Sequence, residues 1–309
     1  MDFVSKALLR KFVGDYGDTQ DPGVRRAYGY LEAWVGILGN VLLAGLNAAL
    51  GLMLNSISLL AQSVHTAADV VTSVIVLAGF AAASRPPDEQ HPHGHGRVET
   101  MASLVIAILL AIVGFEFASK AVGRIIGGAV VKGNPGVVAV LLAVGLAKEW
   151  MARFSISLGR AIGSPALEAD AWHHRSDAVA SALSSVSIAS AVAGYPKVDA
   201  ALGVAVSVLI AYTGVKLGWS SASVLMGERP DPELASAVDE VVRSVDGVKD
   251  MHRFVLHDYG ATKVGSVHIQ VAPDLNVKES HSIAGAVRRR LREEFSIDCV
   301  VHVEPGAEP

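Results

Sequence analysis

Long apolar runs separated by short polar segments dominate the first three quarters of the chain. Runs of about 20 apolar residues, the length that an α-helix needs to cross a bilayer, can be placed six times. The predicted spans are Leu31 to Leu54, Ile57 to Ala83, Met101 to Ile125, Gly136 to Leu158, Ala171 to Ala193 and Val198 to Val224. The pattern predicts a membrane α-helical fold of six transmembrane helices, with both chain ends on one side.

The pattern changes after Arg229 and Pro230. The stretch DPELASAVDEVVRSVDGVKD has the periodicity of an amphipathic helix, and MHRFVLHDYG and KVGSVHIQVAP alternate as strands do. A second amphipathic helix, NVKESHSIAGAVRRRLREEF, precedes a last strand, IDCVVHVEP. This order predicts a small αββαβ domain of the α+β class. We divide the chain into an N-terminal segment (1–30), a six-helix domain (31–226) and this domain (230–305).

Composition supports a membrane protein with a soluble part. The chain is 51% hydrophobic and 18% charged, with a mean hydropathy of +0.42. A net charge of -4 offers no basic face, so nucleic acid is not expected as a partner. The single cysteine, Cys299, excludes an intrachain disulfide and a cysteine-rich zinc fold. Any metal must therefore be held by histidines and carboxylates.

Basic residues suggest which side of the membrane each loop faces. They are concentrated in the N-terminal segment, in the loop after the second span and around the loop after the fourth, which favours cytoplasmic N- and C-termini. The residues concerned are Lys6, Arg10, Lys11, Arg25, Arg26, Arg85, Arg97, Lys148, Arg153 and Arg160. Lys120, Arg124 and Lys132, near the loop after the third span, argue for the opposite side.

Two pairs of polar residues recur at one spacing inside the predicted spans. His65 precedes Asp69 by four residues in the second span, and His173 precedes Asp177 by four in the fifth. Side chains four apart lie on one face of a helix, and polar groups in a bilayer are costly unless they meet each other, water or an ion. Two imidazoles and two carboxylates together predict a tetrahedral metal site.

The fifth span leaves one alternative open. His174 follows Asp170 by the same four residues, so periodicity alone does not separate this pair from His173 with Asp177. A lone intramembrane histidine is also often a helix-to-helix hydrogen bonder. The recurrence of the pair in two spans is what favours a metal site.

Two further groups of histidines lie outside the spans. The loop after the second span, DEQHPHGHG, supports at most a weak divalent site; it contains Asp88, His91, His93 and His95. In the C-terminal domain, His252 and His268 are expected on adjacent strands, and His302 and Glu304 share a face of the last strand by the two-residue period. His257, His281 and Asp258 lie in the same domain. These residues predict a surface metal cluster.

Together these segments resemble the cation diffusion facilitator family of metal/proton antiporters, in its zinc-transporter-like form. The resemblance rests on LLAQSVHTAADVVTS, HPHGHGRVE, ALEADAWHHRSDAVAS, HDYGATKVGSVHIQVAPDLNVKESH and VVHVEP. Their shared order over most of the chain makes it specific. It implies a homodimer in the cytoplasmic membrane, with a ferredoxin-like or metallochaperone-like cytoplasmic domain for metal binding and dimerisation.

The resemblance also implies which residues bind metal. The transport site maps onto His65, Asp69, His173 and Asp177, which selects His173 over His174. The loop site maps onto Asp88, His91 and His95, and the tail site onto His252, His268, His281, His302 and Glu304, with His281 as a bridge. The chain departs from the zinc-type pattern at Gln62, His93, His257 and Glu304.

The ligand set predicts a secondary transporter and not an enzyme. Zn²⁺ is the expected substrate and regulatory ligand, with Mn²⁺ or Fe²⁺ as the alternative and Co²⁺ and Cd²⁺ tolerated. Metal and protons compete for the same ligand atoms, so we expect antiport, with His65 and His173 as the proton-coupled ligands. A membrane metal sensor is the competing function. A metallohydrolase is disfavoured because no H-E-x-x-H motif is present.

Overall fold

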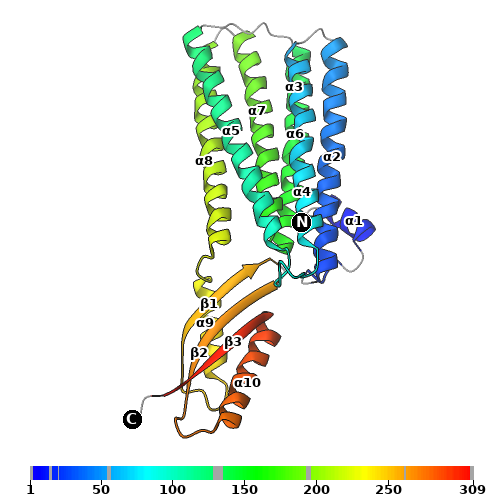
Figure 1. Ribbon diagram of the computed structural model, residues 1–309. Helices are drawn as coiled ribbons and strands as arrows, with labels where there is room; N and C mark the ends of the chain where they lie inside the picture. Colours follow the sequence, from blue (N-terminus) through cyan, green and yellow to red (C-terminus); the bar gives the residue numbers. More distant parts are fainter. Residues whose placement is uncertain are drawn as a thin grey trace. The chain divides into compact units, whose positions relative to one another are not determined.

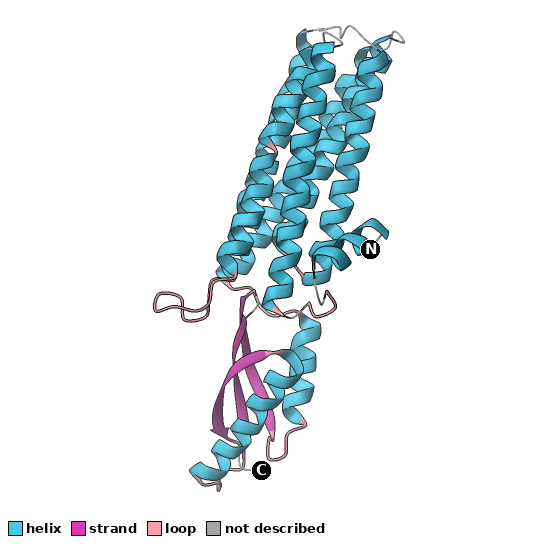
Figure 2. Cartoon of the chain, turned by 90° about the vertical axis from the view of Figure 1, so that its right-hand side faces the viewer, coloured by secondary structure: helices cyan, strands magenta, loops and turns pink. Residues whose placement is uncertain are grey.

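The computed structural model describes residues 3–13, 16–19, 21–53, 57–127, 135–192, 196–260 and 262–306. The chain divides into two compact units (Figure 1). The first contains Met1–Ser84 and Val98–Ala222, and the second contains Arg85–Arg97 and Ser223–Pro309. The first unit is helical, and the second has three strands with helices (Figure 2).

Helices α1 to α8 precede the strands along the chain. They are α1 (Phe3–Phe12), α2 (Pro22–Met53), α3 (Ile57–Ala68), α4 (Val70–Ala83), α5 (Arg97–Gly127), α6 (Pro135–Ile162), α7 (Pro165–Val192) and α8 (Pro196–Met226). Among the described residues, four segments are long and apolar enough to cross a membrane: Pro22–Met53, Gln62–Ala83, Arg97–Gly123 and Ser207–Met226. The fourth and fifth predicted spans fall in α6 and α7, which do not meet this criterion, so six spans stay a prediction.

Helix α2 begins at Pro22, earlier than the predicted start at Leu31. Asp21 caps it, because its carboxylate accepts a hydrogen bond from the Val24 amide at 2.9 Å. Proline suits the first helical turn, where its missing N–H is not needed. The added turns bring Tyr28 and Gly29 into the helix, and both are buried.

The second predicted span is divided at Asp69, where α3 ends and α4 begins. The backbone of Asp69 stays in the right-handed helical region, at φ −64° and ψ −18°. Its amide still donates to the His65 carbonyl at 3.1 Å, and the Thr72 hydroxyl donates to the Asp69 carbonyl at 2.8 Å. The Asp69 carboxylate makes no cap hydrogen bond, so it is free to face other helices.

Small residues let α5 and α8 approach closely. A Cβ atom at Gly114 would lie 2.5 Å from the Ala211 amide nitrogen, and one at Gly214 would lie 2.6 Å from that of Ala111. Such contacts between small residues are typical of helix pairs in membranes. Ser103 on α5 and Ser221 on α8 are also hydrogen-bonded at 2.9 Å. The pair therefore associates through backbone proximity and one polar contact.

The second unit has the predicted αββαβ order. Its elements are α9 (Pro232–Arg243), β1 (Asp250–Tyr259), β2 (Thr262–Val271), α10 (Val277–Phe295) and β3 (Ile297–Pro305). The sheet order is β1-β2-β3, with β1 antiparallel and β3 parallel to β2. The parallel pair is possible because α10 forms the crossover between β2 and β3.

The sheet buries one face. On β2, burial alternates with the strand period, and Val267, Ile269 and Val271 are buried with residues of α9 and α10, such as Val242 and Leu291. His268 lies between them and so points to the other face. In the register it stands opposite His252 on β1 and His302 on β3. Three histidines are thereby aligned across three strands on the face away from the helices.

Candidate metal transport site

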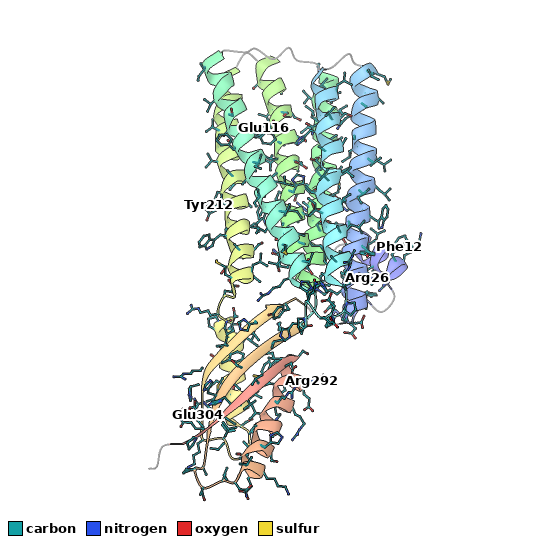
Figure 3. All side chains as sticks on the ribbon, viewed as in Figure 1. Phe12, Arg26, Glu116, Tyr212, Arg292 and Glu304 are labelled. Carbon is teal, nitrogen blue, oxygen red and sulfur yellow. The ribbon has the colours of Figure 1, made fainter. Side chains whose placement is uncertain are left out.

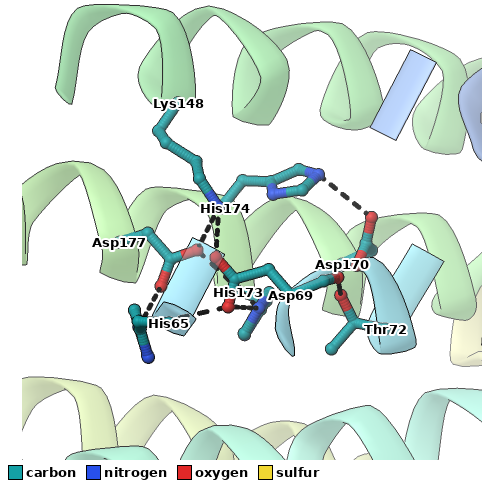
Figure 4. A network of polar contacts seen from close by, with 8 residues as sticks. All are labelled: His65, Asp69, Thr72, Lys148, Asp170, His173, His174 and Asp177. Carbon is teal, nitrogen blue, oxygen red and sulfur yellow. Dashed lines mark hydrogen bonds and ion pairs between the residues drawn. The ribbon is translucent and has the colours of Figure 1, made fainter. Parts of the chain in front are cut away.

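The two His-x-x-x-Asp pairs meet inside the helical unit (Figure 4). His65 lies on α3, Asp69 at the α3–α4 junction, and His173 and Asp177 on α7. His173 Nε2 is 3.5 Å from Asp69 Oδ1 and 3.7 Å from Asp177 Oδ2. His65 Nε2 is 3.7 Å from Asp177 Oδ1 and 4.0 Å from Asp69 Oδ1. Each histidine thus lies near the carboxylate of the other pair as well as that of its own pair.

These separations are close to those of a tetrahedral metal site. Ligand atoms about 2.0 Å from a tetrahedral ion lie about 3.3 Å from one another. The measured 3.5–4.0 Å separations are slightly wider. Asp69, His173 and Asp177 are buried, while the His65 side chain is 34% exposed. His65, Asp69 and Asp177 each place a ligand atom within 4.8 Å of the others, and His173 lies close to both carboxylates without joining that group.

Lys148 of α6 holds the two carboxylates together. Its Nζ atom is 2.6 Å from Asp69 Oδ2 and 2.7 Å from Asp177 Oδ2, and the side chain is fully buried. Both contacts are short, charge-assisted hydrogen bonds. The distribution of basic residues marks Lys148 only as a cytoplasmic-side residue, and its contact with the carboxylates was not predicted. A single lysine inside the apolar run of the fourth predicted span was the available signal, since intramembrane charges are usually paired.

A second polar cluster lies beside the first. His174 Nε2 is 3.2 Å from Asp170 Oδ2, and Glu32 of α2 brings a carboxylate oxygen within 4.8 Å of both. The Ser155 hydroxyl of α6 donates to Glu32. The structure therefore contains both pairs that periodicity left open on α7, and it places His173 at the first cluster and His174 at the second.

The three loop residues with the predicted ligand types come together. Asp88 Oδ1 is 3.2 Å from His91 Nδ1, and Asp88 Oδ2 is 3.3 Å from His95 Nε2. The His91 amide donates to the Asp88 carboxylate, which lowers the pKa of Asp88. His93 points elsewhere, since its ring packs against Tyr259 with centroids 5.1 Å apart. The loop thus offers three ligands, and His93 is not one of them.

The tail cluster centres on Glu304, which Figure 3 labels on the last strand. Its oxygens lie 2.8 Å from His268 Nδ1, 3.2 Å from His252 Nε2 and 3.7 Å from His302 Nε2. The hydrogen bond from His268 lowers the pKa of Glu304. His281 is exposed on α10, which packs against the opposite face of the sheet. No contact between His281 and this cluster is found among the described residues of the protomer.

Two other contacts bear on residues near these sites. Glu149 pairs with Arg153 at 2.8 Å, as expected from their four-residue spacing, and also with Arg175 at 3.2 Å. Arg97 donates to the Asp258 carbonyl at 3.1 Å and stacks over Tyr259. The positions of the loop histidines relative to the sheet of the same unit are thus fixed by aromatic and cationic contacts.

The chain matches known proteins along most of its length. Residues 33–226 match the cation efflux transmembrane domain, and residues 230–306 match the cation efflux protein cytoplasmic domain. An uncharacterised transporter of Methanocaldococcus jannaschii is 34% identical, covering 87% of this chain and 95% of the relative. The manganese efflux system protein MneP of Bacillus subtilis is 31% identical, covering 88% of this chain and 95% of the relative. The magnetosome protein MamB of Paramagnetospirillum magneticum is 30% identical, covering 85% of this chain and 88% of the relative. The chain is a cation efflux transporter that belongs to the cation diffusion facilitator family.

Proposed function

We propose that the chain exports a divalent transition-metal ion across the cytoplasmic membrane in exchange for protons, with Zn²⁺ as the substrate. The proposed transport site is His65, Asp69, His173 and Asp177. The observation that carries the proposal is the convergence of two imidazoles and two carboxylates from α3, α7 and the α3–α4 junction.

The bound ammonium of Lys148 adds support, because it shows that the two carboxylates favour a positive charge between them. A divalent ion entering the site would displace Lys148 from Asp69 Oδ2 and Asp177 Oδ2. The ion carries twice the charge of the ammonium, so it attracts the carboxylates more strongly, and it also binds two histidine nitrogens. Metal binding is therefore an exchange of cations, which avoids leaving two carboxylates unpaired in a dry interior.

Ligand chemistry favours Zn²⁺. Two histidine nitrogens with two carboxylate oxygens suit a tetrahedral ion, whereas Mg²⁺ prefers octahedral oxygen ligands. Mn²⁺ is the second candidate, because MneP, at 31% identity, is named as a manganese efflux protein. Four ligand types do not by themselves separate the two metals, since affinity order and geometry act together. Fe²⁺, Co²⁺ and Cd²⁺ belong in the same comparison.

Proton coupling follows from the chemistry of the ligands. An imidazole binds metal only in its neutral form, so metal and protons compete for the same nitrogen. With an ordinary pKa near 6.5, histidine exchanges protons near neutral pH. A gradient that is acidic outside would therefore release the metal on that side and favour return of the carrier. His65 and His173 are the proposed proton-exchanging ligands.

The remaining features of the proposal concern assembly. Residues 1–30 and 230–305 lie in the cytoplasm, residues 31–226 form six spans, and the protein is a homodimer. The match of residues 230–306 to the family's cytoplasmic domain supports this orientation. Metal at the loop ligands (Asp88, His91, His95) and at the tail ligands (His252, His268, His281, His302, Glu304) would regulate transport.

The test is flux in proteoliposomes with a pH gradient imposed or collapsed, for Zn²⁺, Mn²⁺, Fe²⁺ and Cd²⁺ in turn. We expect Zn²⁺ flux that depends on the gradient and falls to background in Asp177→Asn and His173→Ala. The matched control is Glu116→Gln, which removes a carboxylate from α5 outside both clusters (Figure 3). It should keep its flux.

Three outcomes would contradict the proposal. Flux that does not respond to the pH gradient would contradict the proposed proton antiport. Flux of Mn²⁺ but not Zn²⁺ would show that Mn²⁺, and not Zn²⁺, is the substrate. Full flux in both site variants would contradict the assignment of the transport site.

A further inference from the structure

The second polar cluster inside the helical unit, formed by Glu32, Asp170 and His174, has no part in the transport site described above. One oxygen from each carboxylate and one imidazole nitrogen lie within 4.8 Å of one another. Glu32 is 1% exposed, and Asp170 and His174 are fully buried. Two helices, α2 and α7, supply these groups, and Ser155 of α6 contacts Glu32.

Several ligand atoms of this cluster lack a partner. Glu32 Oε2, Asp170 Oδ1 and His174 Nδ1 are buried and have no hydrogen-bond partner among the described residues. Buried polar atoms are otherwise almost always satisfied, so exceptions of this kind require an explanation. Three such atoms on three neighbouring side chains point to an occupant that contacts all of them.

Charge distinguishes this cluster from the first. At the transport site, Lys148 contacts both carboxylates. No Lys or Arg in the described part of the chain has an ion pair with Glu32 or Asp170. Arg25, which lies on the same helix as Glu32, pairs with Glu99 instead. Two buried carboxylates without a cationic side chain favour a bound cation strongly.

Helix α2 packs closely against the residues beside this cluster. Gly36 is one turn beyond Glu32, and a Cβ atom there would lie 2.4 Å from Ser73 Oγ and 3.8 Å from His174 Nε2. A side chain at this position would therefore collide with Ser73. Ser73 Oγ is itself fully buried without a hydrogen-bond partner among the described residues, so it is a further oxygen beside the cluster.

We propose that Glu32, Asp170 and His174 form a second intramembrane site for a divalent metal ion, next to the transport site. The ring centroids of His173 and His174 are 6.1 Å apart, so an ion could pass from one imidazole to the next. Asp170 lies nearer than Asp177 to the start of α7, and that end faces the cytoplasm in the proposed orientation. The second site would receive metal from the cytoplasm before it reaches Asp69 and Asp177.

The donor set defines the class of ion. Two carboxylates, an imidazole and nearby hydroxyls form a more oxygen-rich set than the transport site, which favours harder divalent ions such as Mn²⁺. This inference rests on the proposed transport function, since it assigns the second site to the same substrate path. It also predicts a difference between the two sites, with Mn²⁺ favoured at the second more than at the first.

The test is anomalous X-ray scattering from crystals of the full chain equilibrated with Mn²⁺ alone. We expect a manganese peak among Glu32, Asp170 and His174 in the unmodified protein. The peak should persist in Asp69→Asn/Asp177→Asn, which disables the transport site. In Glu32→Gln and in Asp170→Asn, made separately, the Mn²⁺ concentration that gives half occupancy there should rise by about tenfold or more, because even disturbing the partner of a ligand lowers metal affinity by this much. Glu116→Gln should leave the peak unchanged.

The outcomes separate this inference from the transport proposal. A peak at the transport site, with gradient-driven flux but no density at the second cluster, overturns the second site and leaves transport standing. The second site is also overturned if neither Glu32→Gln nor Asp170→Asn weakens the peak. Absence of density at the second cluster would instead be explained by a proton shared between Glu32 and Asp170. A peak at the second cluster without any flux would instead overturn the transport proposal and keep the metal site.

Discussion

At the scale of single residues, Lys148 is the feature that most changes the description of the transport site. Two carboxylates without a counter-charge would be strongly unfavourable in a dry interior. With the ammonium 2.6 and 2.7 Å away, both are hydrogen-bonded and partly neutralised. The Lys148 ammonium therefore stabilises an arrangement in which the two carboxylates lie close together.

Replacing Lys148 tests this role. Lys148→Met should lower the free energy of unfolding by about 3–5 kcal/mol without metal, since removing one partner of a buried ion pair leaves the other uncompensated. Zn²⁺ should restore most of this loss, because an ion that binds the folded state stabilises it by mass action. Thermal unfolding in detergent, with and without Zn²⁺, measures both effects.

The matched control is Lys278→Met, which removes an exposed lysine from α10. Its unfolding should resemble that of the unmodified protein at every Zn²⁺ concentration. If Lys148→Met were as stable as the control without metal, the ion pairs would contribute nothing and the gathered site would need another explanation.

The sequence allowed the pairs within one helix to be predicted, and not the contacts between helices. His65 with Asp69 and His173 with Asp177 follow from a spacing of four residues. Lys148 is 79 residues from Asp69 and 29 from Asp177. Which face of α6 meets them depends on helix packing, and no period along one helix contains that information.

At the scale of elements, local signals in the sequence mark where α2 begins but not where the second span is divided. Asp21 and Pro22 are a helix-start signal, and α2 does begin there. The division at Asp69 had no such signal, because neither glycine nor proline occurs at that point. The αββαβ order and the placement of His252 and His268 on adjacent strands were predicted from strand alternation and are confirmed, whereas the register that sets the two histidines opposite each other was not predicted.

Cys299 offers a test of the sheet. It is 2% exposed on β3, and burial raises the pKa of its thiol to about 11. Because the folded pKa is above the unfolded value of about 8.5, folding favours the thiol form. This stabilisation is complete below the unfolded pKa and is lost as the pH rises through about 11. Alkylation by iodoacetamide at pH 8 should therefore be slow in the native protein and rapid after denaturation.

A neighbouring position gives the control for this measurement. Val300 is 69% exposed on the same strand, so Val300→Cys in a Cys299→Ala background should react rapidly without denaturant. Equal alkylation rates for native Cys299 and for this variant would mean that β3 opens readily and that the thiol is not protected by burial.

At the scale of the whole molecule, α6 and α7 decide how many times the chain crosses the membrane. Both are 28 residues long, which exceeds the length that a span requires. Helix α7 carries four ionisable side chains of the two clusters, Asp170, His173, His174 and Asp177, and these polar groups lower its hydropathy. Composition alone does not decide whether such a helix spans the membrane, so the number of spans is a matter for direct labelling.

Surface labelling distinguishes six spans from four. In a Cys299→Ala background, we expect Glu89→Cys and Arg160→Cys to resist an impermeant maleimide in intact cells and to react once the membrane is opened. Both positions are exposed, and with six spans both face the cytoplasm. Gly136→Cys, at the start of α6, should react from outside and shows that the reagent is active.

With only four spans, α6 and α7 would stay on the outer side, and Arg160→Cys would be labelled in intact cells. That result would contradict the proposed topology. It would also place Lys148, His173 and Asp177 outside the bilayer and remove the reason for their pairing.

The lysine at the transport site has a further consequence for which ions the carrier ignores. A tethered ammonium acts at an effective concentration in the millimolar range or above, and it cannot diffuse away. Sodium or potassium would exchange one charge for one charge and gain little from imidazole nitrogens, which suit transition metals. A divalent metal gains an extra charge and nitrogen ligands. We therefore expect Lys148 to keep the abundant monovalent cations of the cell out of the proposed site.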